Sequence, residues 1–234
     1  MLTYTSWVNE KIKIAQAIDS GCCGGSYDEG ALIACASISA MAALAWPGDR
    51  IDKKRFVEIL AQVADGNTNP NPLKISIPLL CQEDQFFKSI LLPSNKSFYK
   101  TEENDKDYSE LIDCLRQKGI AIDTTQQQTI KKNSYGFLLY NQVRCGFVHE
   151  YKIGHNATSF DALRNIGKVN ANAVSYTNSI NINNSNQRKI HFPIFWISHV
   201  AKNVAQWLDE QRLKQGMQIF EKLNLARPSI WWIQ

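Results

Sequence analysis

The sequence lacks the motifs by which several large enzyme classes are recognised. It contains no GxSxG, no HExxH, and no glycine-rich loop that ends in Lys-Ser or Lys-Thr. These absences argue against hydrolases built on a nucleophile elbow, zinc proteases and P-loop nucleotide-binding proteins. The one glycine-rich stretch, GCCGGSYDEG at residues 21–30, follows no clear strand. It is predicted to be a flexible connection between two helices.

Metal-binding and disulfide patterns are also missing. The six cysteines are scattered, with Cys22 and Cys23 adjacent, so they form neither a disulfide framework nor the paired spacing of a zinc site. No histidine pairs with another histidine, cysteine or carboxylate at a ligand spacing. The four histidines are His149, His155, His191 and His199. We therefore expect reduced thiols, no metal site and no cofactor.

Strong charge and a signal peptide are missing as well. The net charge is only +4, which is compatible with a polyanionic partner but too mild to imply one. The start, MLTYTSWVNEKIK, has no apolar signal core, and the weakly polar run from Gly30 to Trp46 is short of a membrane span. With 44% hydrophobic and 21% charged residues, the 234-residue chain is expected to form a single cytoplasmic globular domain, 1–234.

Apolar periodicity and helix breakers predict a mainly α fold, a helical bundle. The middle is ambiguous, since residues 73–92 suit a short strand followed by a helix. Residues 65–72 are a loop by composition, and the charged residues 100–107 indicate a solvated loop or the start of a helix. The predicted helices are Tyr4–Ile18, about Asp28–Ala45, one from about Asp52, Ser109–Lys118, Thr125 to about Glu150 with Thr124 or Thr125 as N-cap, and Phe195 to about Leu223.

An Asn-rich segment at about 154–192 interrupts the helical pattern. Within it, ANAVSYTNSINI and RKIHFPIF are typical of two strands, so we predict a β-hairpin insertion. His191, beside Arg188 and Lys189, is expected on a solvated edge strand, and His199 is expected to be a partly buried helix residue. The apolar ending SIWWIQ is expected to dock on the fold or to mediate self-association.

The stretch YGFLLYNQVRCGFVHEYK, residues 135–152, places Arg144 and His149 at the end of an apolar helix. It resembles the signature of the HEPN superfamily, an Arg followed after four to six residues by His, late in a helical bundle. One departure is Cys145, because the family often has a polar residue there, commonly Asn. The resemblance covers about residues 135–152, and the Asn-rich segment has no counterpart in the minimal HEPN bundle.

Cleaving RNA without a metal needs a base for the 2′-hydroxyl, an acid for the leaving oxygen and a cation for the phosphorane. Histidine suits both proton transfers and arginine suits the phosphate. One motif supplies too few groups, whereas two copies across a symmetric dimer supply enough. The resemblance accordingly implies a homodimeric, metal-independent endoribonuclease that leaves 2′,3′-cyclic phosphate, with catalytic Arg144 and His149. Lys131, Lys132 and Lys152 are candidates for binding the RNA backbone.

Three functional interpretations stay open. The first is a HEPN-type ribonuclease of a prokaryotic defence or toxin system, with a possible neutralising antitoxin or regulatory partner. The second is a catalytically silent HEPN-like module that binds nucleic acid or a partner protein. The third is an unrelated helical scaffold in which Arg144 caps helix carbonyls and His149 is a core residue. Five residues along an ideal helix place Arg144 and His149 about 140° apart, so a shared cleft predicts a bend near Gly146.

Overall fold

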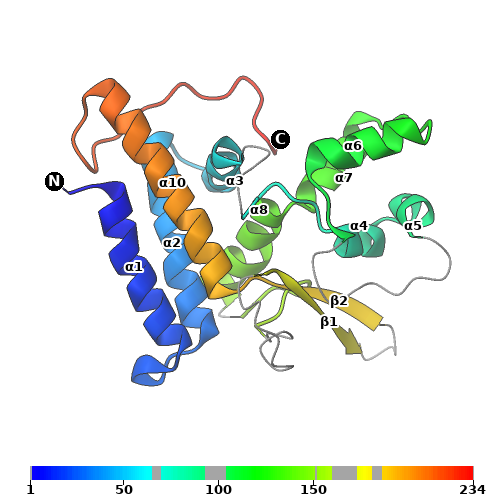
Figure 1. Cartoon of the computed structure of the whole chain (residues 1–234), viewed down its shortest axis with the longest axis horizontal. Coiled ribbons are helices and arrows are strands. Elements are labelled where there is room, and N and C mark those ends of the chain that lie inside the picture. The colour runs from blue at the N-terminus through cyan, green and yellow to red at the C-terminus, as the bar shows by residue number, and fades with distance from the viewer. Residues whose placement is uncertain are drawn as a thin grey trace.

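The protein is mainly helical, with one small two-stranded antiparallel sheet (Figure 1). The computed structural model describes residues 2–64, 70–92, 104–150, 152–159, 173–180 and 186–233. The predicted combination of a helical bundle and a β-hairpin is therefore confirmed. Parts of the predicted loops, at residues 65–69 and 100–103, lie outside the described residues, as do residues 160–172 and 181–185 of the Asn-rich segment.

Three long helices lie side by side and form one half of the molecule (Figure 1). They are α1 (Tyr4–Asp19), α2 (Tyr27–Ala45) and α10 (Ile194–Gln215). Capping boxes begin the first two, since Thr3 exchanges hydrogen bonds with Ser6, and Ser26 exchanges hydrogen bonds with Glu29. A fourth helix, α3 (Asp52–Val63), packs on α2 and α10, and together these helices enclose the main core.

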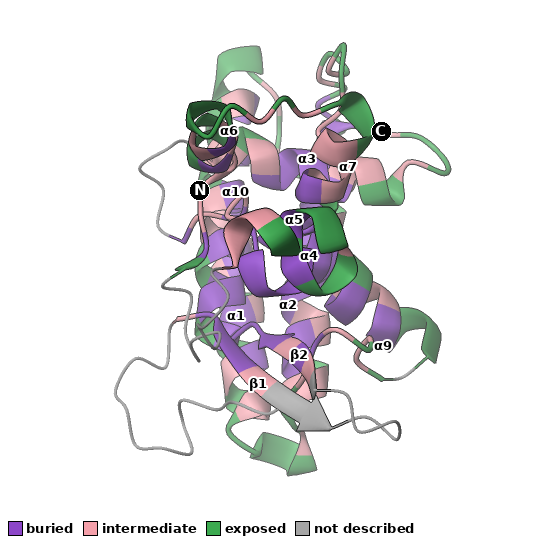
Figure 2. Cartoon of the chain, turned by 90° about the vertical axis from the view of Figure 1, so that its right-hand side faces the viewer, coloured by how far each residue is buried: buried purple, intermediate pink, exposed green. Residues whose placement is uncertain are grey.

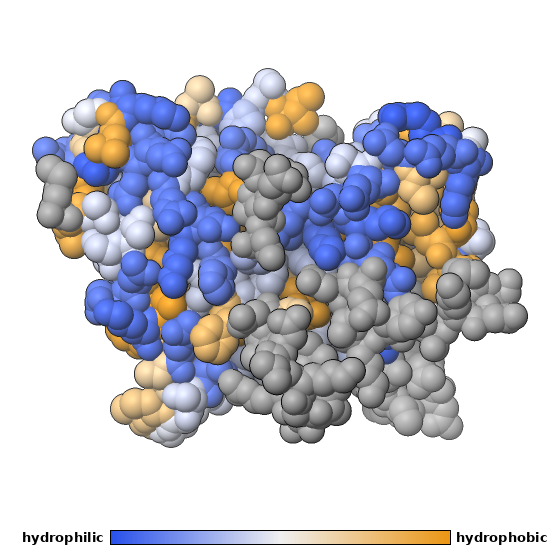
Figure 3. Space-filling view, viewed as in Figure 1, coloured by the Kyte–Doolittle hydropathy of each residue, from blue (hydrophilic) through white to orange (hydrophobic). Residues whose placement is uncertain are grey.

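A smaller lobe of short helices has its own apolar core (Figure 1). It consists of α4 (Ile77–Glu83), α5 (Gln85–Leu91), α6 (Tyr108–Gln117) and α7 (Thr124–Lys132). Hydrophilic residues cover much of the visible surface, and apolar surface shows through over the small lobe (Figure 3). A cavity of about 580 Å³ lies between α6 and α7, lined in part by Tyr108, Ile112 and Ile122.

One helix joins the two halves. It comprises α8 (Tyr135–Leu138), η3 (Leu139–Arg144) and α9 (Cys145–Glu150), which follow one another without a break. It contacts α2 and α3 on one side and α7 on the other. The motif residues therefore lie on the element that connects the main core to the small lobe.

The hairpin is formed by β1 (Ser175–Ile180) and β2 (Asn186–His191). The strands pair antiparallel, with Ser175 opposite His191. The strand β2 contacts α4, and Figure 2 shows the buried ends of both strands against the helices. The hairpin prediction is confirmed, but His191 and Arg188 are 2% and 6% exposed, so the prediction of a solvated edge strand was wrong.

The long helix predicted from Thr125 to Glu150 is two helices. Asp123 caps α7 instead of Thr124 or Thr125, because its side chain accepts from Gln126 N at 2.8 Å. The chain breaks at Asn133 and Ser134, where the Asn133 carbonyl accepts from Ser76 N. Ser134 then caps α8. The break was missed because it is fixed by contacts with α4, which lies about fifty residues earlier in the chain.

The remaining helix predictions differ at their ends. The C-terminal helix ends at Gln215 instead of Leu223, because Gly216 adopts a left-handed conformation with φ +65°. Residues 73–92 form two helices separated at Asp84, and in place of the expected strand Ile75 makes two isolated β-bridges, with Lys106 and Ser134. His199 is exposed, so its predicted partial burial was wrong; its Nδ1 lies 2.9 Å from Phe195 O.

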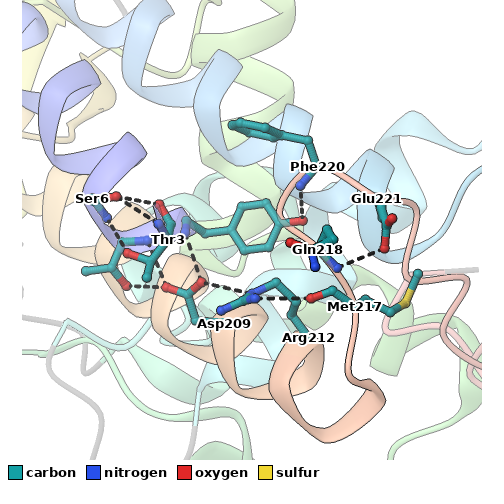
Figure 4. A network of polar contacts seen from close by, with 10 residues as sticks. Thr3, Ser6, Asp209, Arg212, Met217, Gln218, Phe220 and Glu221 are labelled. Atoms are coloured by element: carbon teal, nitrogen blue, oxygen red, sulfur yellow. Dashed lines mark hydrogen bonds and ion pairs between the residues drawn. The ribbon is translucent and has the colours of Figure 1, made fainter. Parts of the chain in front are cut away.

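The two ends of the described chain are held on the main helices. Asp209 of α10 accepts hydrogen bonds from Tyr4 N and Thr5 N at 2.9 Å each, and Arg212 donates to Met217 O (Figure 4). The apolar C-terminal tail, residues 229–233, packs on its own chain, and Ile233 is buried. The first of the two predictions for this tail, docking on the fold, is thus the one observed.

The run from Gly30 to Trp46 forms most of α2, and the expectation that it is too short for a membrane span was wrong on length and composition alone. By length and composition it is the one described helix that would suit a membrane span, and 50% of its most apolar window is buried inside the fold. It packs against α1, α3 and α10. These contacts are those of a core helix.

Candidate functional site

The bend predicted near Gly146 does not occur. Cys145 has helical angles, φ −69° and ψ −40°, and α9 continues through Glu150. The irregularity lies one turn earlier, in η3, where Cys145 N donates to Tyr140 O, five residues back, as in a π-helix. With ideal helical geometry from Arg144 to His149, the two residues are placed about 140° apart around the axis.

Gly146 serves a different purpose from the predicted one. A Cβ atom at this position would overlap the carbonyl oxygen of Lys152 and would lie 3.0 Å from Gly154 N. The returning chain is bonded here, because Gly154 N donates to Gln142 O at 2.7 Å. The glycine thus permits residues 152–154 to fold back against the helix that carries Arg144 and His149.

Arg144 is half-buried and is held by the turn before it. Its guanidinium carbon lies 5.2 Å from the centroid of the Tyr140 ring, a cation–π contact between residues four apart on one helix. Its Nη1 lies 4.0 Å from Cys145 Sγ. Sulfur is a weak acceptor, so Cys145 replaces only in part the polar residue common in HEPN motifs. These contacts orient the side chain while leaving part of it exposed.

Cys35 and Tyr140, two groups near Arg144, stay uncharged at neutral pH. Burial raises the pKa of the Cys35 thiol on α2 to about 12, although the charge of Arg144 opposes this rise. The pKa of Tyr140 is also raised to about 12, by burial first and then by Cys145. Neither side chain supplies an anion to neutralise Arg144, so its positive charge is available to a phosphate.

His149 is exposed on the last turn of α9, and Figure 2 shows that α9 ends at the surface. In the part of the chain that the structure describes, no hydrogen bond or ion pair involves His149, and none joins it to Arg144. Its neighbour Val148 is 42% exposed, an apolar side chain left beside the histidine. A core role for His149, as the scaffold interpretation requires, does not fit this position.

The three predicted RNA-binding lysines do not gather around Arg144. Lys152 lies just beyond α9 and is paired with Glu150 at 3.3 Å, an exposed pair that contributes little. Lys131 and Lys132 end α7, at the other end of the joining helix, where about 14 Å of helix separates Tyr135 from Arg144. Of the three lysines, only Lys152 lies near the motif, because its backbone packs against Gly146.

Lys131 is covered by the C-terminal tail. Its Nζ lies 4.8 Å from the Trp232 ring centroid and 5.7 Å from that of Tyr108. Burial lowers the pKa of Lys131, while the nearby Glu58 opposes the change. Lys132 is exposed. Lys131 is therefore engaged in packing, and Lys132 is the more accessible of the two.

A buried polar cluster fixes the start of the joining helix. The hydroxyl groups of Tyr135 and Tyr176 each lie 2.5 Å from Asp105 Oδ2, and Ile77 N donates to Asp105 Oδ1 at 2.9 Å. The Tyr176 hydroxyl also lies 2.8 Å from Ser76 Oγ. Burial raises the pKa of Asp105 to about 7, although these hydrogen bonds oppose the rise. The cluster links α4, α8 and β1 through one carboxyl group.

Several of these residues were missed by reasoning from sequence. Tyr140 stands four residues before Arg144, so the helical spacing alone could have placed its ring under the guanidinium. Asp105 gave no signal, because its partners lie 30 and 71 residues away in the chain. Across the described residues, no group of three or more His, Cys, Asp or Glu side chains is arranged to hold a metal ion.

Comparison with known proteins adds no relative: no family model, no curated protein and no solved structure matches this chain.

Proposed function

We propose that this chain is a metal-independent endoribonuclease of the HEPN type, active as a homodimer in the cytoplasm of a prokaryote as part of a defence or toxin system. The observation that carries the proposal is the state of the two motif side chains. His149 is exposed on the last turn of α9, and Arg144 is oriented by Tyr140 with no carboxylate partner in the described part of the chain. A side chain that serves only to pack the core is usually buried or paired within its own chain.

The chemistry assigned to the pair follows from their ordinary properties. A neutral imidazole can remove the proton of a 2′-hydroxyl, and a protonated one can donate a proton to the leaving 5′-oxygen. The 2′-oxygen attacks the adjacent phosphorus and the bond to the 5′-oxygen breaks, which leaves a 2′,3′-cyclic phosphate. The guanidinium of Arg144 stabilises the negative charge that develops on the phosphorane oxygens.

The straight helix lacks the bend that a shared cleft was predicted to need, so this proposal requires a second copy of the motif. Because Arg144 and His149 point about 140° apart, one chain does not direct both at a single phosphate. A two-fold interface along α9 would bring two arginines and two histidines to one cleft. The exposed Val148 between them is an apolar side chain that such an interface would bury. Lys152 and Lys132 are the lysines left to contact the RNA backbone.

The test is RNA cleavage in excess EDTA by wild type and by His149→Ala. His199→Ala is the matched control, because His199 is also an exposed helical histidine but lies on α10. The proposal expects cleavage that survives chelation, yields cyclic phosphate ends, is lost in folded His149→Ala and is retained in His199→Ala. Equal cleavage by all three proteins would assign the activity to a contaminant or to another site.

A second candidate is a catalytically silent HEPN-like module that binds nucleic acid or a partner protein. The observation in its favour is the straight helix through Gly146, which keeps the two motif side chains apart. This candidate expects dimerisation or RNA binding without cleavage, and no change in either when His149 is replaced by alanine. Gel-shift and cleavage assays on the same RNA distinguish the two candidates.

A further inference from the structure

The loop between α1 and α2 carries two exposed thiols that face each other. Cys22 Sγ and Cys23 Sγ are 3.6 Å apart, and both side chains are exposed. Neither contributes to the main core or to the small core. The pair lies outside the helix of the candidate ribonuclease site, so this inference does not rest on the proposed function.

The backbone of this loop is fixed at both ends. The residue Gly21 follows the end of α1 with φ +91°, and Cys23 itself has φ +57°, an uncommon conformation for a residue with a side chain. Gly24 N donates to Gly21 O, and Gly25 N donates to Cys22 O. Together with the capping box that begins α2, these bonds hold the turn in the form that brings two neighbouring thiols to one side.

The separation of the sulfurs indicates what the pair is suited to bind. Two thiolates about 2.3 Å from one atom are about 3.3 Å apart at a pyramidal centre and about 3.8 Å apart at a tetrahedral one, and the observed distance lies between these values. A disulfide needs sulfurs about 2.05 Å apart and Cα atoms at least about 4.4 Å apart, whereas adjacent residues have Cα atoms about 3.8 Å apart. Chelation therefore requires almost no movement, and a disulfide would require distortion of the turn.

We propose that Cys22 and Cys23 form a bidentate dithiol site for a soft, thiophilic ion, such as trivalent arsenic or monovalent copper. Soft thiolate ligands favour such ions over magnesium or calcium. With trivalent arsenic two S–H bonds break and two As–S bonds form, while oxygen on the arsenic leaves as water, so no oxidant is consumed.

Phenylarsine oxide is the probe, because it bridges two neighbouring thiols, and the adduct is read by intact-protein mass spectrometry in excess glutathione. Wild type is expected to take up one phenylarsenic group with loss of water, and dithiothreitol should remove it. Cys22→Ser and Cys23→Ser should each bind the probe at least about a hundredfold more weakly. The remaining thiol forms one As–S bond and lacks the second, intramolecular one. Both changes lie in an exposed turn, so the variants are expected to fold.

Cys114→Ser is the matched control, since Cys114 is a partly exposed thiol on α6 that has no part in the pair. It should bind the probe as wild type does. Equal binding by wild type and by either single variant of the pair would overturn the proposal. So would an adduct that peptide mapping places on a different cysteine.

Discussion

The guanidinium of Arg144 lies over the ring of Tyr140, with 5.2 Å between the guanidinium carbon and the ring centroid. The two residues are four apart on one helix, and η3 brings the ring under the charge. The tyrosine ring in turn packs against Phe56 of α3. The orientation of Arg144 therefore depends on the main core, through the contacts from Arg144 to Tyr140 and from Tyr140 to Phe56, and not on the exposed end of α9.

Replacement of Tyr140 tests this relationship. Tyr140→Phe keeps the ring and should retain RNA cleavage within about twofold. Tyr140→Leu removes a cation–π contact of about 0.5–1 kcal/mol and should lower kcat/KM by roughly two- to fivefold. The measurement is initial cleavage rates for both variants, with folding checked by circular dichroism. Equal rates for the phenylalanine and leucine variants would show that the ring does not position the arginine.

The buried carboxyl group of Asp105 predicts a pH dependence of stability. Its pKa is raised to about 7 in the folded protein, against an ordinary value of 3.8. The folded state thus binds more protons between these values, and this group's contribution to stability is fully present below about pH 4. It declines as pH rises towards 7 and is constant above it. Between pH 5 and pH 8 wild type should lose about 2–3 kcal/mol relative to Asp105→Asn.

Urea unfolding of wild type and Asp105→Asn at pH 5 and pH 8 measures this difference. The asparagine keeps an acceptor for the two tyrosine hydroxyl groups but has no proton to bind or release near neutral pH. All other titrating groups are shared by the two proteins, so their effects cancel. Parallel dependence of the two unfolding free energies on pH would contradict a neutral, buried Asp105.

The C-terminal tail predicts a stability effect at Trp232. Its backbone N donates to Glu58 Oε2 at 2.7 Å, and its ring contacts both Tyr108 and Lys131. Trp232→Ala should lower the free energy of unfolding by about 2 kcal/mol, less than for a fully buried tryptophan because the side chain is half-exposed. Ile230→Ala is the control, since Ile230 is 68% exposed, and should change it by less than about 0.5 kcal/mol. Equal effects in urea unfolding would show that the tail contributes no docking energy.

The proposed dimer interface predicts an effect at Val148, which lies beside His149 and is 42% exposed. A lysine buried there on association would meet the unneutralised Arg144 side chains, so Val148→Lys should raise the dimer dissociation constant at least about tenfold. Ile14→Lys makes the same kind of change at an equally exposed site on α1 and should leave dimerisation unchanged. Sedimentation equilibrium measures both. Dissociation by the second variant and not the first would move the interface to the α1 side.

Local signals predicted most of the helices, because the groups that begin and end them are neighbours in sequence. Ser26 and Glu29 show where α2 begins, and Trp46-Pro47-Gly48 shows where it ends. The break before α8 was missed because it depends on Asn133, whose side chain donates to Glu83 Oε2, fifty residues away. A contact of that range has no signature in a local window. Gly216, by contrast, is a glycine in a polar stretch that could have marked the end of α10.

In the candidate site too, features with a local sequence signal were predicted and features that depend on long-range contacts were missed. The pairing of an arginine and a histidine on the last turns of an apolar helix was visible in the sequence, and so was the spacing that brings Tyr140 to Arg144. The use of Gly146 was misread, because the chain that packs against it returns from Lys152 and Gly154. Whether a glycine serves a bend or a close approach depends on which segment comes near it, and that is decided by the tertiary fold.

The central claim is that two copies of the motif act together, and protomer mixing tests it most directly. Wild type is mixed with His149→Ala in varied proportion, reassembled through mild denaturant and assayed for RNA cleavage in EDTA. If each site needs both histidines of a random dimer, activity follows the square of the wild-type fraction and is about one quarter at equal proportions. A linear decline, with about one half at equal proportions, would mean that each chain acts alone and would contradict the composite site.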